Sequence, residues 1–316
     1  MIRFAILDDY GGRARGMAPW DRLAGKVQVD FFSDTVRGET LAARLQPYDA
    51  LMMIRERTPM PRALIARLPN LKLLITAGMR NRAIDHAACR ERGIVVCGTG
   101  TGQDPTVELA WGLILALTRG IAAEDRALRE GRWQDGLGFG IRGKTLGVLG
   151  LGKLGKGVAK VGQAFGMPVI AWSQNLQPAD AAALGVRRVE KDELFARADV
   201  LSIHVVLSER TRGLVGAREL ALMKPSSILV NTSRAGIVDT AALVSALHSG
   251  GLAGAGIDVF DEEPLPPDAP ILRAPNTVLT PHLGYVTRES YQVYFNEALE
   301  DLEAWLAGAP VRLVAE

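Results

Sequence analysis

The chain has 316 residues, of which 48% are hydrophobic and 23% are charged, a composition typical of globular proteins and unlike that of disordered ones. At roughly 150 residues per domain, this length predicts about two domains. The 37 basic and 35 acidic residues give a net charge of only +2, which argues against nucleic acid or an anionic membrane as the main partner.

Cysteine usage and the lengths of the apolar runs narrow the class of protein further. The two cysteines, Cys89 and Cys97, are too few for a disulfide scaffold and favour a reducing, cytoplasmic setting. The longest apolar run, Leu109–Leu117, has about half of the roughly 20 residues that a membrane-spanning helix needs. Ile2–Leu7 is too short for a secretory signal. We therefore expect a protein without a membrane partner.

The first third of the chain alternates short apolar runs with helical patterns. The apolar runs have strand length and are bounded by Gly, Pro, Asn or Asp: Ile2–Leu7, Val27–Phe32, Ala50–Ile54, Leu71–Ile75 and Ile94–Cys97. The patterns that suit helices are Thr40–Gln46, Pro61–Arg67 and Ile84–Arg92. Such alternation predicts a parallel sheet that is covered by helices on both faces.

A loop rich in Gly and Thr follows Gly98, and after it one helical pattern runs from about Pro105 to Arg129. Between Pro105 and Leu117 this pattern is apolar on too many sides for a helix that faces solvent. We therefore expect a long helix whose first half lies in the core or in a subunit interface.

A second alternating block fills the rest of the chain. Its strand candidates are Thr145–Leu149, Val169–Trp172, Val200–Ile203, Ile228–Asn231, Gly256–Val259 and Val278–Thr280. Its helical patterns include Leu154–Phe165, Lys191–Arg197, Ala217–Met223 and Thr240–Ser249, and Arg288–Leu306 forms a last amphipathic helix. These strands suffice for a complete doubly wound sheet. We expect an α/β protein with one domain formed by residues 1–97 and 284–316 and a second formed by residues 98–283.

A glycine motif follows the first strand of the second block. Gly150, Gly152 and Gly155 have the G-x-G-x-x-G spacing, with a strand pattern before them and a helical pattern after them. In dinucleotide-binding folds the first glycine permits a tight turn, the second lets the backbone approach a pyrophosphate, and the third lets helix and sheet pack closely. The alternative is that these glycines serve only a tight turn between strand and helix.

An acidic residue is missing at the end of the next strand, where Ser173 follows Trp172. An Asp or Glu at this position would bind the adenosine ribose 2′-hydroxyl and repel a 2′-phosphate. Neutral Ser173 does neither strongly, and no Arg lies beside it. The sequence therefore leaves the cofactor as NAD(H) or NADP(H), with a slight preference for tolerance of NADP(H).

Three later segments begin where predicted strands end: Asn231–Gly236, Asp258–Pro264 and Thr280–Gly284. The carboxyl ends of parallel strands lie at one edge of a sheet, where open α/β sheets bind ligands. The segments bring a guanidinium, a carboxylate and an imidazole to that edge. Taken singly, each has a plain alternative: a surface arginine, a solvated acidic turn and a histidine that caps a backbone group.

As a set, these groups suit the reduction of a 2-oxo acid. The forked guanidinium of Arg234 can bind a carboxylate through two hydrogen bonds. An imidazole such as that of His282 can donate a proton near neutral pH as hydride arrives, and a nearby carboxylate favours its charged form. Beside a dinucleotide-binding turn, the three groups predict hydride transfer.

Over nearly its whole length the chain resembles the D-isomer-specific 2-hydroxyacid dehydrogenases. The motifs that carry the resemblance are, in order, Gly150–Gly155, Asn231–Gly236, Asp258–Pro264 and Thr280–Gly284. The resemblance implies that Arg234 binds the substrate carboxylate and carbonyl and that His282 is the acid/base. Glu263, the glutamate immediately before the proline, is implied as the partner of His282.

The resemblance has further implications for cofactor, fold and assembly. It implies cofactor contacts for Lys153 and Leu154 at the pyrophosphate, Thr232 and Arg234 along the cofactor, Asp258 at the nicotinamide amide, and His204 nearby. It also implies a Rossmann-like cofactor domain, a flavodoxin-like substrate domain, a cleft between them, and a homodimer formed through the cofactor domain. Because no Cys–His cluster has ligand spacing, we expect no metal.

Two segments match the family's substrate loops more loosely. Arg55 lies where the family has an Arg-Ser-x-Thr loop, but Glu56 replaces the usual small residue. Ala77, Gly78 and Met79 lie where family members offer backbone N–H groups to the substrate carboxylate, although the common second glycine is absent here. The alternative for Arg55 is a solvated loop without substrate contact.

These observations predict an NAD(P)-dependent reductase of small 2-oxo acids, such as glyoxylate, hydroxypyruvate or an aryl pyruvate, acting reversibly on the D-2-hydroxy acid. Two alternatives remain. One is a related hydride-transfer enzyme that acts on formate or phosphite. The other is a non-catalytic regulator that senses a dinucleotide and acts through partners.

Overall fold

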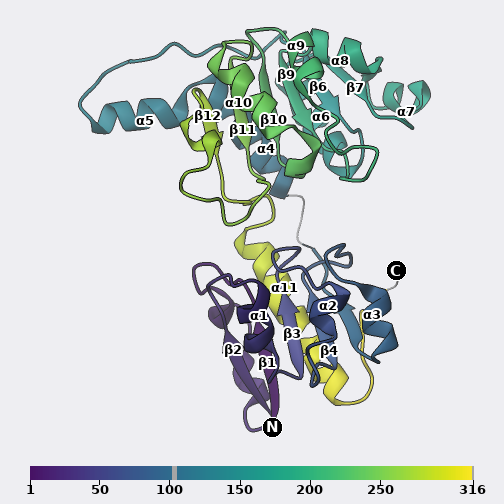
Figure 1. The fold of residues 1–316 in the computed structure, drawn as a ribbon. Helices are drawn as coiled ribbons and strands as arrows, with labels where there is room; N and C mark the ends of the chain where they lie inside the picture. Colours follow the sequence, from purple (N-terminus) through teal and green to yellow (C-terminus); the bar gives the residue numbers. More distant parts are fainter. Residues whose placement is uncertain (102–104, 315–316) are drawn as a thin grey trace. The chain divides into compact units, whose positions relative to one another are not determined.

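The computed structural model describes residues 1–101 and 105–314, and the chain divides into two compact units (Figure 1). Unit 1 comprises Met1–Gln103 and Val286–Glu316, and unit 2 comprises Asp104–Tyr285. Each unit contains one parallel sheet with helices, so the predicted α/β class is confirmed. The boundaries expected from the sequence, after residues 97 and 283, lie a few residues from this division.

Unit 1 contains a five-stranded sheet in the order β2-β1-β3-β4-β5, the strand order of flavodoxin-like folds. Its strands are β1 (Ile2–Ile6), β2 (Val27–Phe31), β3 (Ala50–Met53), β4 (Leu73–Thr76) and β5 (Val95–Gly98). Its α-helices are α1 (Gly38–Leu45), α2 (Arg62–Ile65), α3 (His86–Glu91) and α11 (Arg288–Leu306). All residues of β3 and β4 are buried, as expected for strands that are covered on both faces.

Unit 2 contains a seven-stranded sheet in the order β12-β11-β10-β9-β6-β7-β8. Its strands are β6 (Leu146–Leu149), β7 (Val169–Trp172), β8 (Arg187–Arg188), β9 (Val200–Ile203), β10 (Ile228–Asn231), β11 (Gly254–Ile257) and β12 (Thr277–Leu279). The order reverses beside β6, which is the topological switch point where doubly wound sheets bind ligands. Since all pairs are parallel, the carboxyl ends of these strands share one edge.

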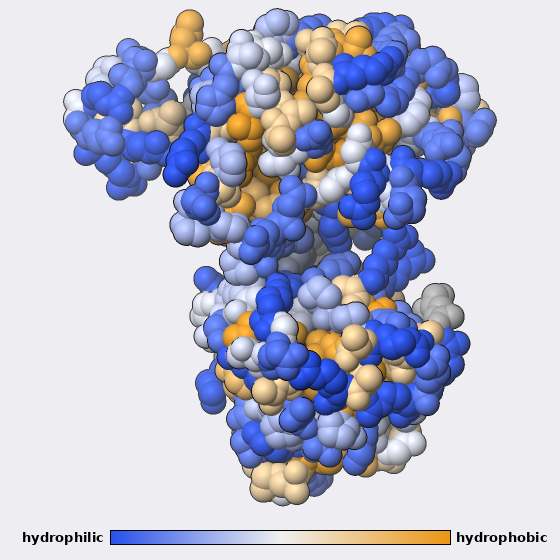
Figure 2. Space-filling view, in the orientation of Figure 1, coloured by the Kyte–Doolittle hydropathy of each residue, from blue (hydrophilic) through white to orange (hydrophobic). Residues whose placement is uncertain are grey.

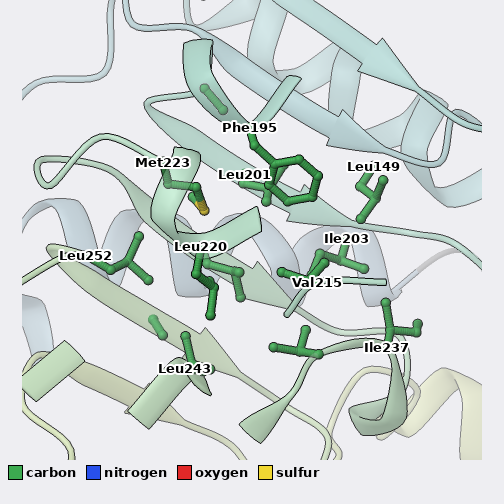
Figure 3. Close-up of a cluster of buried hydrophobic side chains, with 14 of the residues drawn as sticks. Leu149, Phe195, Leu201, Ile203, Val215, Leu220, Met223, Ile237, Leu243 and Leu252 are labelled. Atoms are coloured by element: carbon green, nitrogen blue, oxygen red, sulfur yellow. The ribbon is translucent and has the colours of Figure 1, made fainter. Parts of the chain in front are cut away.

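Alternate side chains of the central strands enter two cores on opposite faces of this sheet. One core contains residues of α8 (Lys191–Arg197), α9 (Ala217–Leu222) and α10 (Thr240–His248), and Figure 3 shows its side chains pointing toward one another. The other contains residues of α4 (Pro105–Thr118) and α6 (Lys153–Ala164). In β10, for example, Leu229 belongs to the first core, whereas Ile228 and Val230 belong to the second.

The expectation of one helix from Pro105 to Arg129 was wrong. The structure has α4 and then α5 (Ile121–Arg129), separated at Gly120, which has φ +62°. A left-handed residue ends the hydrogen-bonding pattern of a right-handed helix, and glycine adopts this conformation without steric cost. Among the described residues, no single helix has the length and apolar character to cross a bilayer; α4 and α5 pass that test only as a pair bent by 59°.

The structure also differs from the sequence predictions in smaller elements. It contains α7 (Pro178–Ala182) and the two-residue strand β8, neither of which the sequence suggested. Strand β11 begins at Gly254, two residues before its expected start. Both glycines of β11 pack against α4. A Cβ on Gly256 would lie 3.0 Å from the Cβ of Leu113, and a Cβ on Gly254 would lie 3.3 Å from a methyl carbon of Leu117. A strand of two residues, or a strand that begins with glycine, carries too little apolar signal to be recognised.

Candidate active site

The glycine-rich turn between β6 and α6 has the shape that a dinucleotide requires. Gly150 has φ +100°, and a Cβ there would lie 2.7 Å from the backbone carbonyl carbon of His204. A Cβ on Gly155 would overlap the carbonyl oxygen of Gly150. A Cβ on Gly152, in contrast, would meet no atom within 4 Å. The turn is therefore tightly packed at its first and third glycines and open at the second.

Helix α6 begins at Lys153, directly after the open glycine. The first N–H groups of a helix have no partner within the helix, and together with the helix dipole they attract anions. These N–H groups include those of Lys153 and Leu154. The turn and the start of α6 therefore fit the pyrophosphate of NAD(H) or NADP(H).

The end of β7 offers no carboxylate to an adenosine ribose. The carbonyl oxygen of Trp172 accepts a hydrogen bond from the N–H of Gly150 at 2.9 Å, which places the end of β7 beside the glycine turn. Half-buried Ser173 follows, and then exposed Gln174 and Asn175. None of these side chains would repel a 2′-phosphate.

Within the part of the chain that the structure describes, two buried polar atoms without protein partners lie at the ends of neighbouring strands. Nε2 of His204, after β9, lies 2.8 Å from Oγ of Ser202, but its Nδ1 is buried without a hydrogen-bond partner. Oγ1 of Thr232, after β10, is likewise buried without one. Burial lowers the pKa of His204 to about 4, so its ring is neutral at physiological pH. Orphaned polar atoms at a ligand-binding edge fit a bound ligand that supplies their partners.

His282 and Glu263 form a hydrogen-bonded pair. Nδ1 of His282 lies 2.7 Å from Oε2 of Glu263, and the N–H of Phe260 donates to Oε1 at 2.9 Å. Burial of the carboxyl opposes its ionisation, but the hydrogen bonds and the charge of His282 outweigh burial and hold the pKa of Glu263 below its usual value. Because Nδ1 faces the carboxylate, Nε2 is the ring nitrogen that remains to exchange a proton with a substrate.

Asp258 holds the turn that carries His282. His282 has φ +52°, an uncommon conformation for a side-chain-bearing residue. The fully buried carboxylate of Asp258 accepts hydrogen bonds from the Thr280 hydroxyl (2.6 Å), the Leu283 N–H (2.7 Å) and the Gly284 N–H (2.9 Å). Burial is the largest influence on its pKa and raises it. Both oxygens are thus already engaged with the turn, a role that the sequence did not suggest; its contact with the nicotinamide amide stays a prediction.

Arg234 lies on the same edge of the sheet as the His282–Glu263 pair. It follows β10, and its carbonyl oxygen accepts a hydrogen bond from the Asn231 side chain at 3.0 Å. Its Nη1 donates to the carbonyl oxygen of Ser233 at 2.7 Å. The positive charge of Arg234 is one of the influences that lower the pKa of Glu263. The guanidinium, carboxylate and imidazole expected from three separate motifs therefore interact electrostatically within unit 2.

The loop that follows β4 in unit 1 was expected to present the backbone N–H groups of Ala77, Gly78 and Met79 to a substrate. The Ala77 N–H donates to the Met53 carbonyl oxygen (2.9 Å), and the Gly78 N–H donates to Oγ1 of Thr99 (3.0 Å). Both amides are therefore engaged within the protein in this structure, and their contact with a substrate stays a prediction. Among residues 1–101 and 105–314, the amides of Met79 and Arg80 have no such acceptor. Arg80 was not among the predicted contacts, because the sequence does not show which backbone amides are already hydrogen-bonded within the protein.

Arg55 packs on this same loop. It has φ +57°, and its Nη1 donates to the carbonyl oxygen of Ala77 at 3.2 Å. Its Nε lies 3.8 Å from a carboxylate oxygen of Glu56. The guanidinium also occupies the place where a side chain on Gly78 would lie, and Gly78 has φ +90°, a conformation that residues with a side chain rarely adopt. Glu56, the departure from the family pattern, thus offsets the charge of Arg55.

Metal chemistry has no evident ligand set in the described part of the chain, where no group of three or more His, Cys, Asp or Glu side chains could hold an ion. At the edge of the sheet of unit 2, Glu263 interacts with both His282 and Arg234. Their arrangement suits proton transfer and anion binding.

Comparison with known proteins agrees with this geometry. A family model described as "D-isomer specific 2-hydroxyacid dehydrogenase, NAD binding domain" matches residues 111–284, which lie within unit 2. A glyoxylate reductase of Aeropyrum pernix is 39% identical over 288 residues, covering 87% of this chain and 85% of that protein. A glycerate dehydrogenase of Methylorubrum extorquens is 35% identical over 295 residues, covering 90% of each chain.

A solved structure extends the similarity to the whole fold. The crystal structure of a phosphoglycerate oxidoreductase from Vibrio cholerae o395 matches with a TM-score of 0.92 and 41% identity, covering 98% of this chain and 100% of that one. The predicted cofactor class, NAD(H) or NADP(H), is confirmed at this level. The chain belongs to the D-isomer-specific 2-hydroxyacid dehydrogenase family and is an NAD(P)-dependent oxidoreductase of 2-oxo and 2-hydroxy acids.

Proposed function

We propose that the protein reduces a small 2-oxo acid, such as glyoxylate or hydroxypyruvate, to the D-2-hydroxy acid, and catalyses the reverse oxidation. The observation that carries this proposal is the hydrogen bond of 2.7 Å between His282 and Glu263, on the same sheet edge as Arg234. The names of the relatives, a glyoxylate reductase and a glycerate dehydrogenase, support substrates of this size.

Each of the three side chains has a distinct task in this mechanism. The bound dinucleotide supplies or accepts the hydride. Arg234 binds the substrate carboxylate and polarises its carbonyl oxygen, because the guanidinium fork matches both acceptors. His282, in its charged form, donates the proton on Nε2 to that oxygen as C2 is reduced. Glu263 stabilises the charged ring through Nδ1, and the neutral ring then regains a proton from water.

Unit 1 supplies the remaining substrate contacts in this proposal. The amides of Met79 and Arg80, which have no acceptor in the described part of the chain, suit hydrogen bonds to the substrate carboxylate. Arg55, which follows β3, donates a hydrogen bond to the carbonyl oxygen of Ala77 and packs across Gly78. We assign unit 1 as the substrate-binding domain and unit 2 as the dinucleotide-binding domain.

A substrate panel tests the proposed function. Glyoxylate, hydroxypyruvate, pyruvate and phenylpyruvate are each mixed with NADH or NADPH, and the loss of absorbance at the reduced-cofactor band is followed. Formate and phosphite are offered with NAD⁺ and NADP⁺. We expect turnover of at least one 2-oxo acid and none of formate or phosphite. Dinucleotide binding without any turnover would instead favour a regulatory protein.

We also propose that the protein is a homodimer joined through unit 2. Helix α5 and the segment after it project from the rest of unit 2 (Figure 1), and Figure 2 shows apolar areas on this mainly hydrophilic projection. The exposed apolar side chains there are Ile121 (54% exposed), Leu128 (57%), Trp133 (78%) and Leu137 (100%). Apolar groups this exposed and this close in sequence are typical of a surface that a partner covers.

Replacing Leu137 by glutamate should shift the protein from dimer to monomer, because a charge would be buried in the interface. Light scattering coupled to size-exclusion chromatography measures the mass. Leu184→Glu is the control, since Leu184 is also exposed (38%) on unit 2 but lies outside the projection. A wild-type mass equal to that of one chain, or a variant that remains dimeric, would refute the proposed interface.

The state of the thiols supports a reducing compartment such as the cytoplasm. Cys89 and Cys97 are buried and not joined in a disulfide. Burial raises the pKa of Cys89 to about 11 and that of Cys97 to about 12. Both thiols therefore remain protonated and inert under physiological conditions.

A further inference from the structure

The loop of unit 1 that contains residues 77–80, which we call the substrate loop, rests directly on the end of β5. A Cβ on Gly98 would lie 2.8 Å from the carbonyl oxygen of Gly78 and 3.1 Å from Cα of Met79, too close for a side chain to fit. Thr99 adds two hydrogen bonds: its N–H donates to the Thr76 carbonyl oxygen (3.0 Å), and its Oγ1 accepts the Gly78 N–H (3.0 Å). The position of the loop is therefore set by the position of residues 98–99.

A second segment fixes residue 98 in turn. Residues 312–314, which we call the strap, pair with β5 through an antiparallel bridge between Leu313 and Cys97. The Gly98 N–H donates to the carbonyl oxygen of Arg312 at 2.9 Å, and the Val314 N–H donates to that of Val96 at 3.0 Å. A side-chain methyl of Val314 lies 2.9 Å from the place of a Cβ on Gly98. Gly98 is thus enclosed between the loop and the strap.

One side chain, the guanidinium of Arg312, connects the strap to helix α11. Its Nε donates to Oδ1 of Asp301 (2.9 Å), and its Nη2 donates to the carbonyl oxygen of Glu297 (2.9 Å) and lies 3.0 Å from Oε2 of Glu300. These three residues belong to α11. The backbone of Arg312 is left-handed, with φ +47°, which costs free energy in a residue that carries a side chain. The side-chain contacts with α11 therefore maintain a backbone conformation that the residue does not favour by itself.

The same face of α11 also holds the segment that follows residue 99. Oε2 of Glu297 accepts the N–H of Gly100 at 2.6 Å and lies 3.7 Å from Nε of Arg312. Charge-assisted hydrogen bonds of this length are among the stronger ones in proteins. Helix α11 thus anchors both sides of the support under the substrate loop, through Glu297 on residue 100 and through Arg312 on residue 98.

We propose that Arg312 is a positioning residue for substrate binding: through the strap and Gly98 it holds the loop in which Met79 and Arg80 present their amides. This inference rests on the proposed role of those amides in binding the 2-oxo acid. Arg312 belongs to unit 1 and the dinucleotide-binding turn to unit 2. Loss of Arg312 should therefore weaken substrate binding and leave cofactor binding and the chemical step nearly unchanged.

The test compares Arg312→Leu with the wild type. We expect the KM for the preferred 2-oxo acid to rise about 10-fold, because one or two hydrogen bonds to the substrate carboxylate would be weakened. The kcat and the KM for the cofactor should stay within about two-fold of the wild-type values. Deuterium exchange should accelerate in the peptide covering Leu73–Asn81, whose Ala77 and Gly78 amides are hydrogen-bonded in the native loop. Arg312→Lys keeps the positive charge, so its KM should rise less than that of Arg312→Leu.

A second variant distinguishes the loss of loop positioning from a general loss of stability. Asp301 is fully buried, and burial raises its pKa to about 7 against the attraction of Arg312. Removing Arg312 alone would leave this carboxyl without its cation, so the double variant Asp301→Asn with Arg312→Leu removes both charges. It should show the same KM change with less loss of melting temperature. Arg22→Gln is the matched control, because it removes an ion pair of 2.5 Å to Glu303 of the same helix.

The outcomes separate this inference from the proposed function. An unchanged KM and unchanged exchange in both Arg312 variants would overturn the positioning role, as would an equal effect of Arg22→Gln. If the wild type reduces no 2-oxo acid, the proposed function fails, and the exchange of the Leu73–Asn81 peptide alone then decides whether Arg312 holds the loop. Faster exchange in the Arg312 variants, but not in Arg22→Gln, supports the inference.

Discussion

Replacing His282 by glutamine should lower kcat for 2-oxo acid reduction about 1,000-fold and leave the dissociation constant of the reduced cofactor within about three-fold. General acid catalysis by a positioned side chain contributes about 100- to 10,000-fold, and glutamine cannot release a proton to the substrate oxygen. The dinucleotide-binding turn at Gly150–Gly155 lies on different strands and loops, so its geometry does not depend on the imidazole.

Stopped-flow turnover and titration of the cofactor by fluorescence measure the two effects separately. His248→Gln is the control, since His248 is an exposed histidine of α10 in the same unit. Turnover of the His282 variant within a few-fold of the wild type would remove His282 from the acid/base role. A parallel loss of cofactor affinity would show that the variant disturbs the fold of unit 2 as a whole.

Replacing Arg234 by glutamine should lower kcat/KM about 1,000-fold, with contributions from both a higher KM and a lower kcat. The guanidinium is proposed to hold the carboxylate in the ground state and the developing negative charge on the carbonyl oxygen in the transition state. Arg234→Lys should recover only part of the loss, because an ammonium group cannot form two parallel hydrogen bonds to a carboxylate.

The methyl ester of the same 2-oxo acid shows whether Arg234 recognises the carboxylate. The wild type should use the ester poorly, and Arg234→Gln should lose much less activity on the ester than on the acid. Arg273→Gln is the control, since Arg273 is an exposed arginine of the same unit. Equal losses on acid and ester would mean that Arg234 does not contact the carboxylate.

Much of the fold could be predicted because its central strands are buried on both faces. A strand such as β10 must be apolar at successive positions, since neighbouring side chains enter different cores. Such runs stand out from the sequence, and parallel pairing then brings their carboxyl ends to one edge. The break between α4 and α5 was not predictable in this way, because Gly120 interrupts a pattern that stays apolar on both sides of it.

The convergence of three residues in the candidate site was predictable because their side chains are chemically distinctive. Arg234, Glu263 and His282 each follow a recognisable strand, and the structure shows the interactions among them. Features that depend on hydrogen bonds of the backbone were not predictable. The sequence does not reveal that the Gly78 amide is used by Thr99, or that Asp258 binds the turn of His282. Such contacts depend on the local path of the chain, which residue identity does not specify.

The contact of Arg312 with Gly98, which supports the substrate loop, could not be predicted for a related reason. Arg312 and Gly98 lie more than 200 residues apart in sequence, and neither is part of a motif. Their contact arises because the strap adds to the edge of β5, where backbone groups remain available for pairing. A pattern of apolar residues carries no information about such an addition.

We propose that proton donation depends on the hydrogen-bonded pair of His282 and Glu263, and the pH dependence of kcat/KM tests this most directly. The pKa of Glu263 is lowered, so the group is ionised throughout the range from pH 6 to 9 and its pairing is lost only as pH falls through that lowered value. In Glu263→Gln, the pH at which 2-oxo acid reduction falls to half of its maximum should therefore lie lower than in the wild type, since the negative charge 2.7 Å from Nδ1 is gone. An unchanged midpoint would contradict the account.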